Sequence, residues 1–259
     1  MQDLRHIQVY QSEIKLVIKG KGDSSFLYKD FNPAPSEVII NGETIDPPEN
    51  NMYNFEQDIN YVTIKFNNLI ESCQYMFNGL ANVIEIDLSN FDTSRVTNMF
   101  SMFQSCSNLK RINFGNIDTS HVENMGGLFR LCTKLTSIDV SKFDTSSVTY
   151  MWTMFQFCES LTSIDVSNFD TSNVENMFDL FGYNYELLSV DVSNFDTSKV
   201  QVMQGMFFHC YKLKYVDMFN FDFSSANNLN LIFSEDRSLV YIKFIIKIKK
   251  SPLNSLKIK

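Results

Sequence analysis

The chain repeats itself every 26 residues. Shifted by that length, it aligns with itself without gaps over residues 83–239, and six full copies are visible. The leading aliphatic position of the unit recurs at Val83, Leu109, Leu135, Leu161, Leu187, Leu213 and Leu239. A shortened copy precedes them, in which residues 76–77 match 102–103 and residues 62–66 predict a strand. One such unit cannot bury its own apolar face, so the copies are expected to stack with like residues over like.

Each unit is predicted to contain a short strand followed by a short helical turn. In the clearest copy Leu161, Ile164 and Val166 alternate with polar residues, which is the pattern of a strand with one buried face. Apolar residues then recur with helical spacing at Val174, Met177, Leu180 and Phe181.

The start of that helical segment is marked by serine. Glu or Gln stands three positions after Ser120, Ser172 and Ser198, which predicts a capping box. Because helices need about 8–10 Å between axes and strands need under 5 Å, the stack should curve with its strands inside. The expected fold is an α/β repeat, a curved leucine-rich-repeat-like solenoid with a strand and a short helical turn in each 26-residue unit.

The segments that flank the repeats differ in composition, which predicts three domains. Residues 1–59 are expected to form a small β-rich N-terminal cap, with a strand at 14–19 and a hairpin about Asn41-Gly42. Residues 60–244 form the repeats, and residues 245–259 form a basic C-terminal tail. From Arg237 onward the chain has seven Lys or Arg and no acid. We interpret residues 241–249 as a last strand whose lysines discourage further stacking; a truncated gene product or a basic docking tail are the alternatives.

The overall charge narrows the range of partners. With 30 acidic residues against 22 Lys and Arg, the net charge of −8 argues against nucleic acid or an anionic membrane. No apolar stretch is long enough for a transmembrane helix. The first residues have no apolar signal-peptide core, so we expect either a mature or trimmed chain or an intracellular protein.

The repeat also resembles a known family. Residues 139–158 follow the pattern Asp-Val-Ser-x-Phe-Asp-Thr-Ser-x-Val-x-x-Met-x-x-Met-Phe-x-x-Cys, which is similar to the repeat of BspA-like leucine-rich repeat surface proteins. The resemblance covers about residues 60–244. It implies a secreted or surface-displayed adhesion module that binds proteins of a host or a neighbouring cell. In one departure, the usual backbone-bonding Asn is replaced by Phe91, Ile117, Phe143, Phe169, Phe195 and Phe221.

The cysteines form a ladder rather than a set of disulfide partners. Cys106, Cys132, Cys158 and Cys210 share one repeat position, whereas Cys73 lies elsewhere. Neighbouring cysteines on the wider helical side should exceed the roughly 7 Å Cα limit for a disulfide, so buried free thiols are expected. No Cys-x-x-Cys or His-x-x-x-His motif is present, and we predict no metal site and no cofactor.

Two acidic columns recur along the repeats. The first lies in the Asp-Thr-Ser turns, where it is expected to bond backbone N–H groups, at Asp92, Asp118, Asp144, Asp170, Asp196 and Asp222. The second points outward from the strands and is the predicted partner-binding inner face, with Asp139, Asp165, Asp191, Ser137, Ser163, Ser189, Asp217 and Tyr215. Its carboxylates are either simply hydrated or available to a basic protein surface or Ca²⁺.

An aromatic patch on the outer side is the alternative binding surface. Helical projection exposes Leu131, Phe157 and Tyr183, with Trp152 beside them, unless these side chains turn inward. An enzyme is not expected, because the acids recur in every copy and no His accompanies a Ser or Cys that breaks the repeat. The predicted function is therefore a surface adhesion module. The alternatives are an intracellular leucine-rich-repeat scaffold and an ion-binding structural protein.

Overall fold

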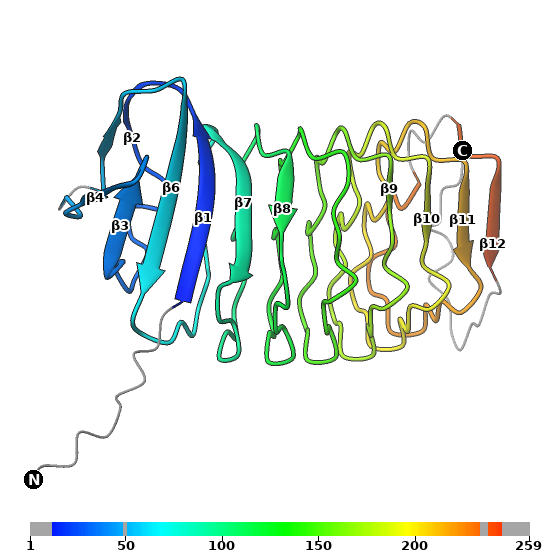
Figure 1. Cartoon of the computed structure of the whole chain (residues 1–259). Coiled ribbons are helices and arrows are strands. Elements are labelled where there is room, and N and C mark those ends of the chain that lie inside the picture. Colours follow the sequence, from blue (N-terminus) through cyan, green and yellow to red (C-terminus); the bar gives the residue numbers. More distant parts are fainter. Residues whose placement is uncertain (1–11, 49–50, 234–237, 245–259) are drawn as a thin grey trace, which may run out of the picture.

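The repeats form a row of stacked coils with a β-sheet at one end. The computed structural model describes residues 12–48, 51–233 and 238–244. Figure 1 shows the coils following one another along a nearly straight row, beginning beside the strands of the N-terminal sheet. The described residues form strands and turns but no helix, and so contain no helix able to cross a lipid bilayer. The fold is all-β, and the prediction of an α/β repeat is wrong.

The segment predicted to be helical is a series of tight turns bonded to the next coil. In one copy the N–H groups of Met99, Ser101 and Phe103 donate to carbonyls 25 positions later, over 2.9–3.0 Å. A helix would instead use carbonyls four positions earlier in its own segment. Ser101 and Ser105 also have φ values of 54° and 61°, which a right-handed helix excludes. Every second N–H thus joins neighbouring coils.

The predicted capping boxes are wrong for the same reason, since no helix begins at these serines. The N–H of Glu123 donates to the carbonyl of Thr97, and the N–H of Glu175 donates to that of Thr149. These bonds accompany a line of single parallel β-bridges that runs from Ser72 through every coil to Asn228. The glutamates mark an exposed hydrogen-bonded edge of the stack.

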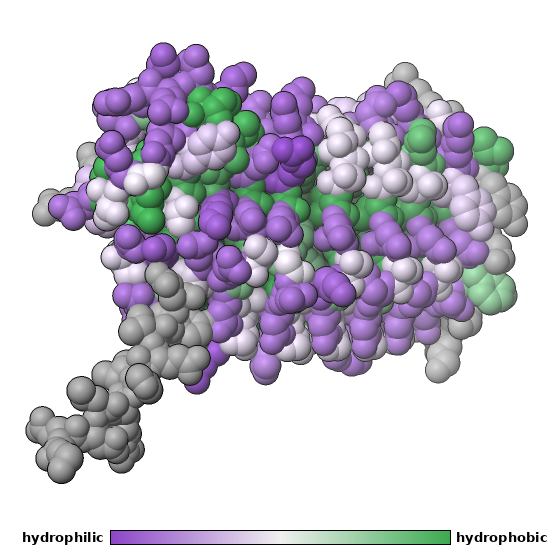
Figure 2. All heavy atoms as spheres, in the orientation of Figure 1, coloured by the Kyte–Doolittle hydropathy of each residue, from purple (hydrophilic) through white to green (hydrophobic). Residues whose placement is uncertain are grey.

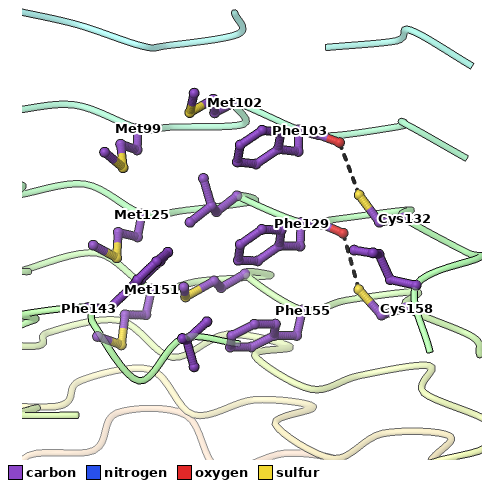
Figure 3. Packing of buried hydrophobic residues seen from close by; sticks show 14 of the residues in the cluster. Met99, Met102, Phe103, Met125, Phe129, Cys132, Phe143, Met151, Phe155 and Cys158 are labelled. Carbon is purple, nitrogen blue, oxygen red and sulfur yellow. Dashed lines mark hydrogen bonds between the residues drawn. The ribbon is translucent and has the colours of Figure 1, made fainter. Parts of the chain in front are cut away.

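The apolar stripe itself was located correctly. Val174, Met177, Leu180 and Phe181 are all buried. In successive coils the equivalent phenylalanines stack face to face at Phe77, Phe103, Phe129, Phe155, Phe181, Phe207 and Phe233. Figure 3 shows three of these rings above one another beside the buried methionines.

The spacing of those rings removes the predicted cause of curvature. Their centroids are 5.3–5.7 Å apart. That is close to the ~4.8 Å between hydrogen-bonded strands and far below the separation of packed helices. Both sides of the stack therefore advance by similar steps. The prediction of a curved leucine-rich-repeat-like horseshoe is wrong.

The strand side of the repeats consists of two parallel groups of strands. β7 (Val83–Asn90) pairs with β8 (Arg111–Asn113), and β9 (Ser163–Ile164) begins a four-stranded sheet. The rest of that sheet is β10 (Ser189–Asp191), β11 (Tyr215–Met218) and β12 (Tyr241–Phe244). The predicted strand in the coil that starts at Leu135 does not form.

The N-terminal sheet confirms the predicted β structure of the cap. Its six-stranded order is β4-β3-β6-β1-β7-β8, so the first repeat strands belong to the same sheet. The strands are β1 (Ser12–Lys19), β3 (Glu37–Ile40), β4 (Glu43–Ile45) and β6 (Ile59–Phe66), while β2 (Gly22–Ser24) pairs separately with β5 (Tyr53–Phe55). β3 and β4 form the predicted hairpin, and Asn41 and Gly42 have the positive φ values that its tight turn requires.

The shortened first copy is only half stacked. Its strand is β6, but β1 lies between β6 and β7 and is antiparallel to both. Its turn half does stack, because the N–H of Phe77 donates to the carbonyl of Met102 over 2.8 Å. An N-terminal strand therefore takes the place that a repeat strand would occupy. At the other end β12 confirms the predicted last strand over 241–244, and the predicted tail at 245–259 lies outside the described residues.

The cysteines are buried and free, but the spacing argument used to predict this was wrong. The coils are close on this side. The thiols of Cys106, Cys132, Cys158 and Cys210 donate to phenylalanine carbonyls 29 positions earlier, over 3.0–3.2 Å. Where the series is interrupted, the side chain of Asn184 donates to the equivalent carbonyl of Phe155 over 2.9 Å. This position thus supplies a hydrogen-bond donor between coils.

Removing one ring from the phenylalanine stack should strongly destabilise the protein. Phe155 lies 5.6 Å from Phe129 and 5.5 Å from Phe181, measured between ring centroids. Phe155→Ala leaves a cavity and breaks both contacts, so unfolding free energy should fall by about 3–5 kcal/mol. Urea titration followed by circular dichroism measures this loss. A loss below about 1 kcal/mol would contradict the assigned packing.

The buried thiols should resist modification in the native state. Burial raises the pKa of Cys106 and Cys158 to about 12, and it also raises the pKa of Cys132. Since the thiolate is the reactive form, a maleimide should leave these three cysteines unlabelled until denaturant is added. Peptide mass spectrometry locates the label, and the denatured sample is the control. Native labelling or quantitative disulfides would overturn the ladder.

Candidate functional site

On one face of the stack, the outward side chains of the strands and of the coil at 135–140 form two parallel rows, and we call this face the strand face. Backbone register places Ser189 between Ser163 and Tyr215, and it pairs Asp191 with Asp217. The serine row contains Glu85, Arg111, Ser137, Ser163, Ser189 and Tyr215. The aspartate row contains Asp87, Asn113, Asp139, Asp165, Asp191 and Asp217. All residues predicted for the inner face lie here, exposed or, for Asp217, half-buried.

A strip of apolar residues separates the two rows. Figure 2 shows it along the molecule, between polar side chains. It includes Ile112 and Ile138, which are half-buried, and Ile164 and Val190, which are buried. The strand face is thus a shallow apolar channel with polar edges.

The cap strands lengthen both rows, which sequence reasoning missed. Val17 pairs with Tyr61 on one side and Glu85 on the other, so β1 and β6 continue the serine row. Lys15 likewise pairs with Thr63 and Asp87 and continues the aspartate row. The alternation of β1 was visible in the sequence, but its position beside β7 was not.

The central aspartates are held by their own turns. One carboxylate oxygen of Asp139, Asp165 and Asp191 accepts the N–H two residues ahead, over 2.9–3.0 Å. Hydrogen bonds from the side chain and the backbone of Ser141 lower the pKa of Asp139, and those from Ser167 lower that of Asp165. Within the described ranges no ion pair involves these three carboxylates. Each of the three is held in place as a hydrogen-bond acceptor of its own turn.

The N-terminal end of the strand face has a different character. A hollow of about 430 Å³ lies across β6, β1, β7 and β8, with Val17, Tyr61 and Ile112 among its lining residues. Its charged side chains already have partners. Arg111 forms an ion pair with Glu85, and the Asn113 amide donates to Asp87 over 3.0 Å.

The alternative outer patch divides into two half-buried aromatic groups. Phe157 and Tyr183 stack with ring centroids 4.2 Å apart. Both residues, like Leu131 of the same column, have φ near 60°, so helical projection did not apply to them. Trp152 instead lies across Gly126, where a Cβ would be 2.9 Å from the indole ring, and its ring contacts Phe100. None of the four predicted side chains is fully exposed.

The Asp-Thr-Ser turns confirm the structural role assigned to the first acidic column. In each turn the aspartate accepts the N–H of the residue two positions later, at Asp92, Asp118, Asp144, Asp170, Asp196 and Asp222. The buried threonines beside them link the coils, since Thr119 Oγ1 donates to the Asp144 carbonyl over 2.8 Å. Ser12 of β1 takes this role for the first coil by accepting the N–H of Asp92.

A backbone-bonding amide ladder is also present, one position before the phenylalanines that were taken to replace it. The side-chain amides of Asn168, Asn194 and Asn220 donate to carbonyls of the preceding coil over 2.6–3.3 Å. The sequence contained evidence for this ladder, since asparagine recurs at this position in consecutive copies.

One buried acid breaks the repeat and was overlooked. Asp179 accepts the side-chain amide of Gln156 over 2.6 Å, and Gln156 in turn accepts Nε of Arg130. Burial raises the pKa of Asp179 to about 6, against the smaller opposing effects of Gln156 and Arg130. The next coil has Gly205 at this position, where any Cβ would fall on the Asp179 carboxylate. In the part of the chain that the structure describes, no three His, Cys, Asp or Glu side chains are grouped closely enough to hold a metal ion.

Comparison with known proteins identifies one family. A family model described as "Mycoplasma protein of unknown function, DUF285" matches residues 71–184 and 158–242, which together cover more than half of the 259 residues. No curated protein and no solved structure matches the chain significantly.

Asp179 should make the stability of the protein depend on pH. Its pKa is raised in the folded state, so the folded state binds this proton more tightly than the unfolded state does. The contribution of Asp179 to the free energy of unfolding is therefore most favourable below about pH 4, and it is lost as the pH rises towards 6. Asp179→Asn keeps an acceptor for Gln156 and removes the titration.

The measurement compares the unfolding free energies of wild type and Asp179→Asn at several pH values. Between pH 4 and 6 the unfolding free energy of the variant should rise relative to that of wild type, by at most about 1.4 kcal/mol per pH unit. Above that range the difference between the two unfolding free energies should be constant. A difference that does not vary with pH would show that Asp179 titrates normally.

Proposed function

From the premise that this chain belongs to the family described as "Mycoplasma protein of unknown function, DUF285", we propose that it is a non-catalytic module that binds a protein through its strand face. The observation that supports this proposal most directly is the row of fixed carboxylates at Asp139, Asp165 and Asp191. They lie beside an apolar strip on the strand face, where β9, β10, β11 and β12 are paired in parallel.

Two physical arguments favour recognition of a partner by this face. Its side chains stand on a rigid stack, so binding orders few additional groups and loses little conformational entropy. The three carboxylates have no ion-pair partner among the described residues. A basic protein surface would complement them, and long-range attraction would accelerate its association at low salt.

The absence of catalysis is part of the proposal. The exposed acids of the strand face recur from coil to coil instead of converging on one point. General acid–base catalysis uses a group of tuned pKa placed within hydrogen-bond reach of one reacting atom. A periodic row of equivalent carboxylates suits an extended contact better than a single reaction centre.

Surface display and adhesion are proposed from the resemblance of the repeat to BspA-like surface-protein repeats. The alternative is an intracellular scaffold for protein–protein interactions. Protease treatment of intact cells that produce the native protein distinguishes the two. Digestion without lysis supports surface display, whereas protection until lysis supports the scaffold.

Changing the charge of the strand face should weaken partner binding. The triple variant Asp139→Asn, Asp165→Asn, Asp191→Asn keeps side-chain shape and removes three charges. We expect at least a tenfold loss of affinity at low salt for a partner captured from cell surfaces, and a weaker salt dependence. Surface plasmon resonance at two salt concentrations measures both quantities.

A matched control removes three charges from another side of the stack. Glu71→Gln, Glu123→Gln and Glu175→Gln change exposed side chains on the edge formed by the single β-bridges. This variant should bind as wild type does. If both triple variants bind normally while Phe157→Ser or Tyr183→Ser abolishes binding, the outer patch is the binding surface and the proposal is wrong.

A further inference from the structure

We propose that the strand face recognises a linear peptide segment with one apolar anchor residue next to basic residues. This inference rests on the proposed function, because it names the partner chemistry of the same face. It is based on the difference between the two ends of the channel, one apolar with its charges paired and the other acidic.

The hollow at the N-terminal end fits an apolar side chain. Val17 and Ile112 are half-buried there. Tyr61, which is opposite Val17 in the sheet, is 63% exposed. The hollow of about 430 Å³ has room for an aromatic or long aliphatic side chain. An anchor in this place would cover apolar surface, which is the main source of favourable binding energy at such contacts.

The charges around the hollow are balanced within the chain. Arg111 is paired with Glu85, and Lys15 lies 3.0 Å from the carboxylate of Glu13. Asp87 accepts the Asn113 amide and is opposite Lys15 in the sheet. A charged ligand group would have to compete with these contacts, whereas an apolar group would not.

The acidic zone begins one coil further along. Asp139, Asp165 and Asp191 follow one another at the spacing of successive coils, roughly 5 Å. Opposite them stand Ser137, Ser163 and Ser189, which are small and uncharged. The channel is therefore open to a chain whose Lys or Arg side chains reach the carboxylates.

The dimensions limit the length of the segment. From Asn113 to Asp191 the stack advances three coils, or about 15 Å. An extended peptide covers this distance in about five residues at roughly 3.3 Å each. Side chains on one side of that peptide recur every second residue, so two basic residues can face the three aspartates. The inferred motif is an apolar residue with basic residues two and four positions away from it on one side.

Selection from a random library tests this motif without a known partner. Phage that display random peptides of about ten residues are selected on the immobilised protein, and the recovered peptides are synthesised and measured by fluorescence anisotropy. Recovered sequences should combine one aromatic or large aliphatic residue with at least two Lys or Arg. Replacing the anchor with Ala should weaken binding at least fivefold, and replacing the basic residues with Glu should abolish it.

Protein variants then locate the two contacts. Val17→Glu should weaken the binding of anchored peptides at least tenfold and leave the binding of the Ala-substituted peptides unchanged. The triple Asn variant should remove the salt dependence of peptide binding. Tyr150→Glu adds the same charge at an exposed position of the β-bridge edge and serves as the control. Denaturant unfolding verifies that each variant is folded, and the peptide substitutions test the motif on unaltered protein.

The outcomes separate this inference from the proposed function. Failure to recover peptides, recovery of peptides without basic residues, or equal binding of anchored peptides to Val17→Glu would overturn the inference. The proposed function would stand in those cases if the captured protein still depends on the three aspartates. If that protein is also insensitive to the triple Asn variant, both proposals are wrong.

Discussion

The backbone hydrogen bonds between successive coils determine the rest of this structure. They join alternate residues of one copy to a neighbouring copy with an offset of 25 or 26 positions, as from Met99 to Asn124 and from Lys110 back to Ile84. Because every coil repeats the same register, each repeat position becomes a column in space. The phenylalanine stack, the thiol ladder, the threonine ladder and the two acidic columns all follow from that single constraint.

Stacking like over like suits apolar and hydrogen-bonding side chains but brings like charges together. Hydrogen bonds within each turn offset this repulsion, since the carboxylates of Asp144 and Asp165 accept N–H groups of their own turns. A buried carboxyl group needs both a hydrogen-bond donor and space in the neighbouring coil. Asp179 is accommodated by a hydrogen bond from Gln156 and by the absence of a side chain at Gly205 in the next coil. Where equivalent positions in adjacent coils both depart from the repeat, as Asp179 and Gly205 do, the two departures therefore indicate a contact between them.

The N-terminal sheet shows how the stack begins. β1 runs antiparallel between β6 and β7, so it shields the edge of the first repeat strand and provides Ser12 where later coils have threonine. The same placement extends the strand face beyond the repeats and creates the hollow lined by Val17 and Tyr61. The cap therefore contributes to the candidate site as well as to the end of the stack.

The sequence by itself determined the repeat register, the buried stripe and the exposed rows, because a constant period aligns equivalent residues and hydrophobicity decides which of them face the core. It could not determine the conformation of the stripe. Met151, Met154 and Phe155 have helical spacing, yet side-chain periodicity does not reveal whether an N–H group bonds within its own segment or to the next coil. The straight stack, the half-buried state of Phe157 and Tyr183, and the position of β1 followed from that choice of partner. Only the tertiary structure decided it, since the carbonyls that accept these bonds belong to a different copy of the repeat.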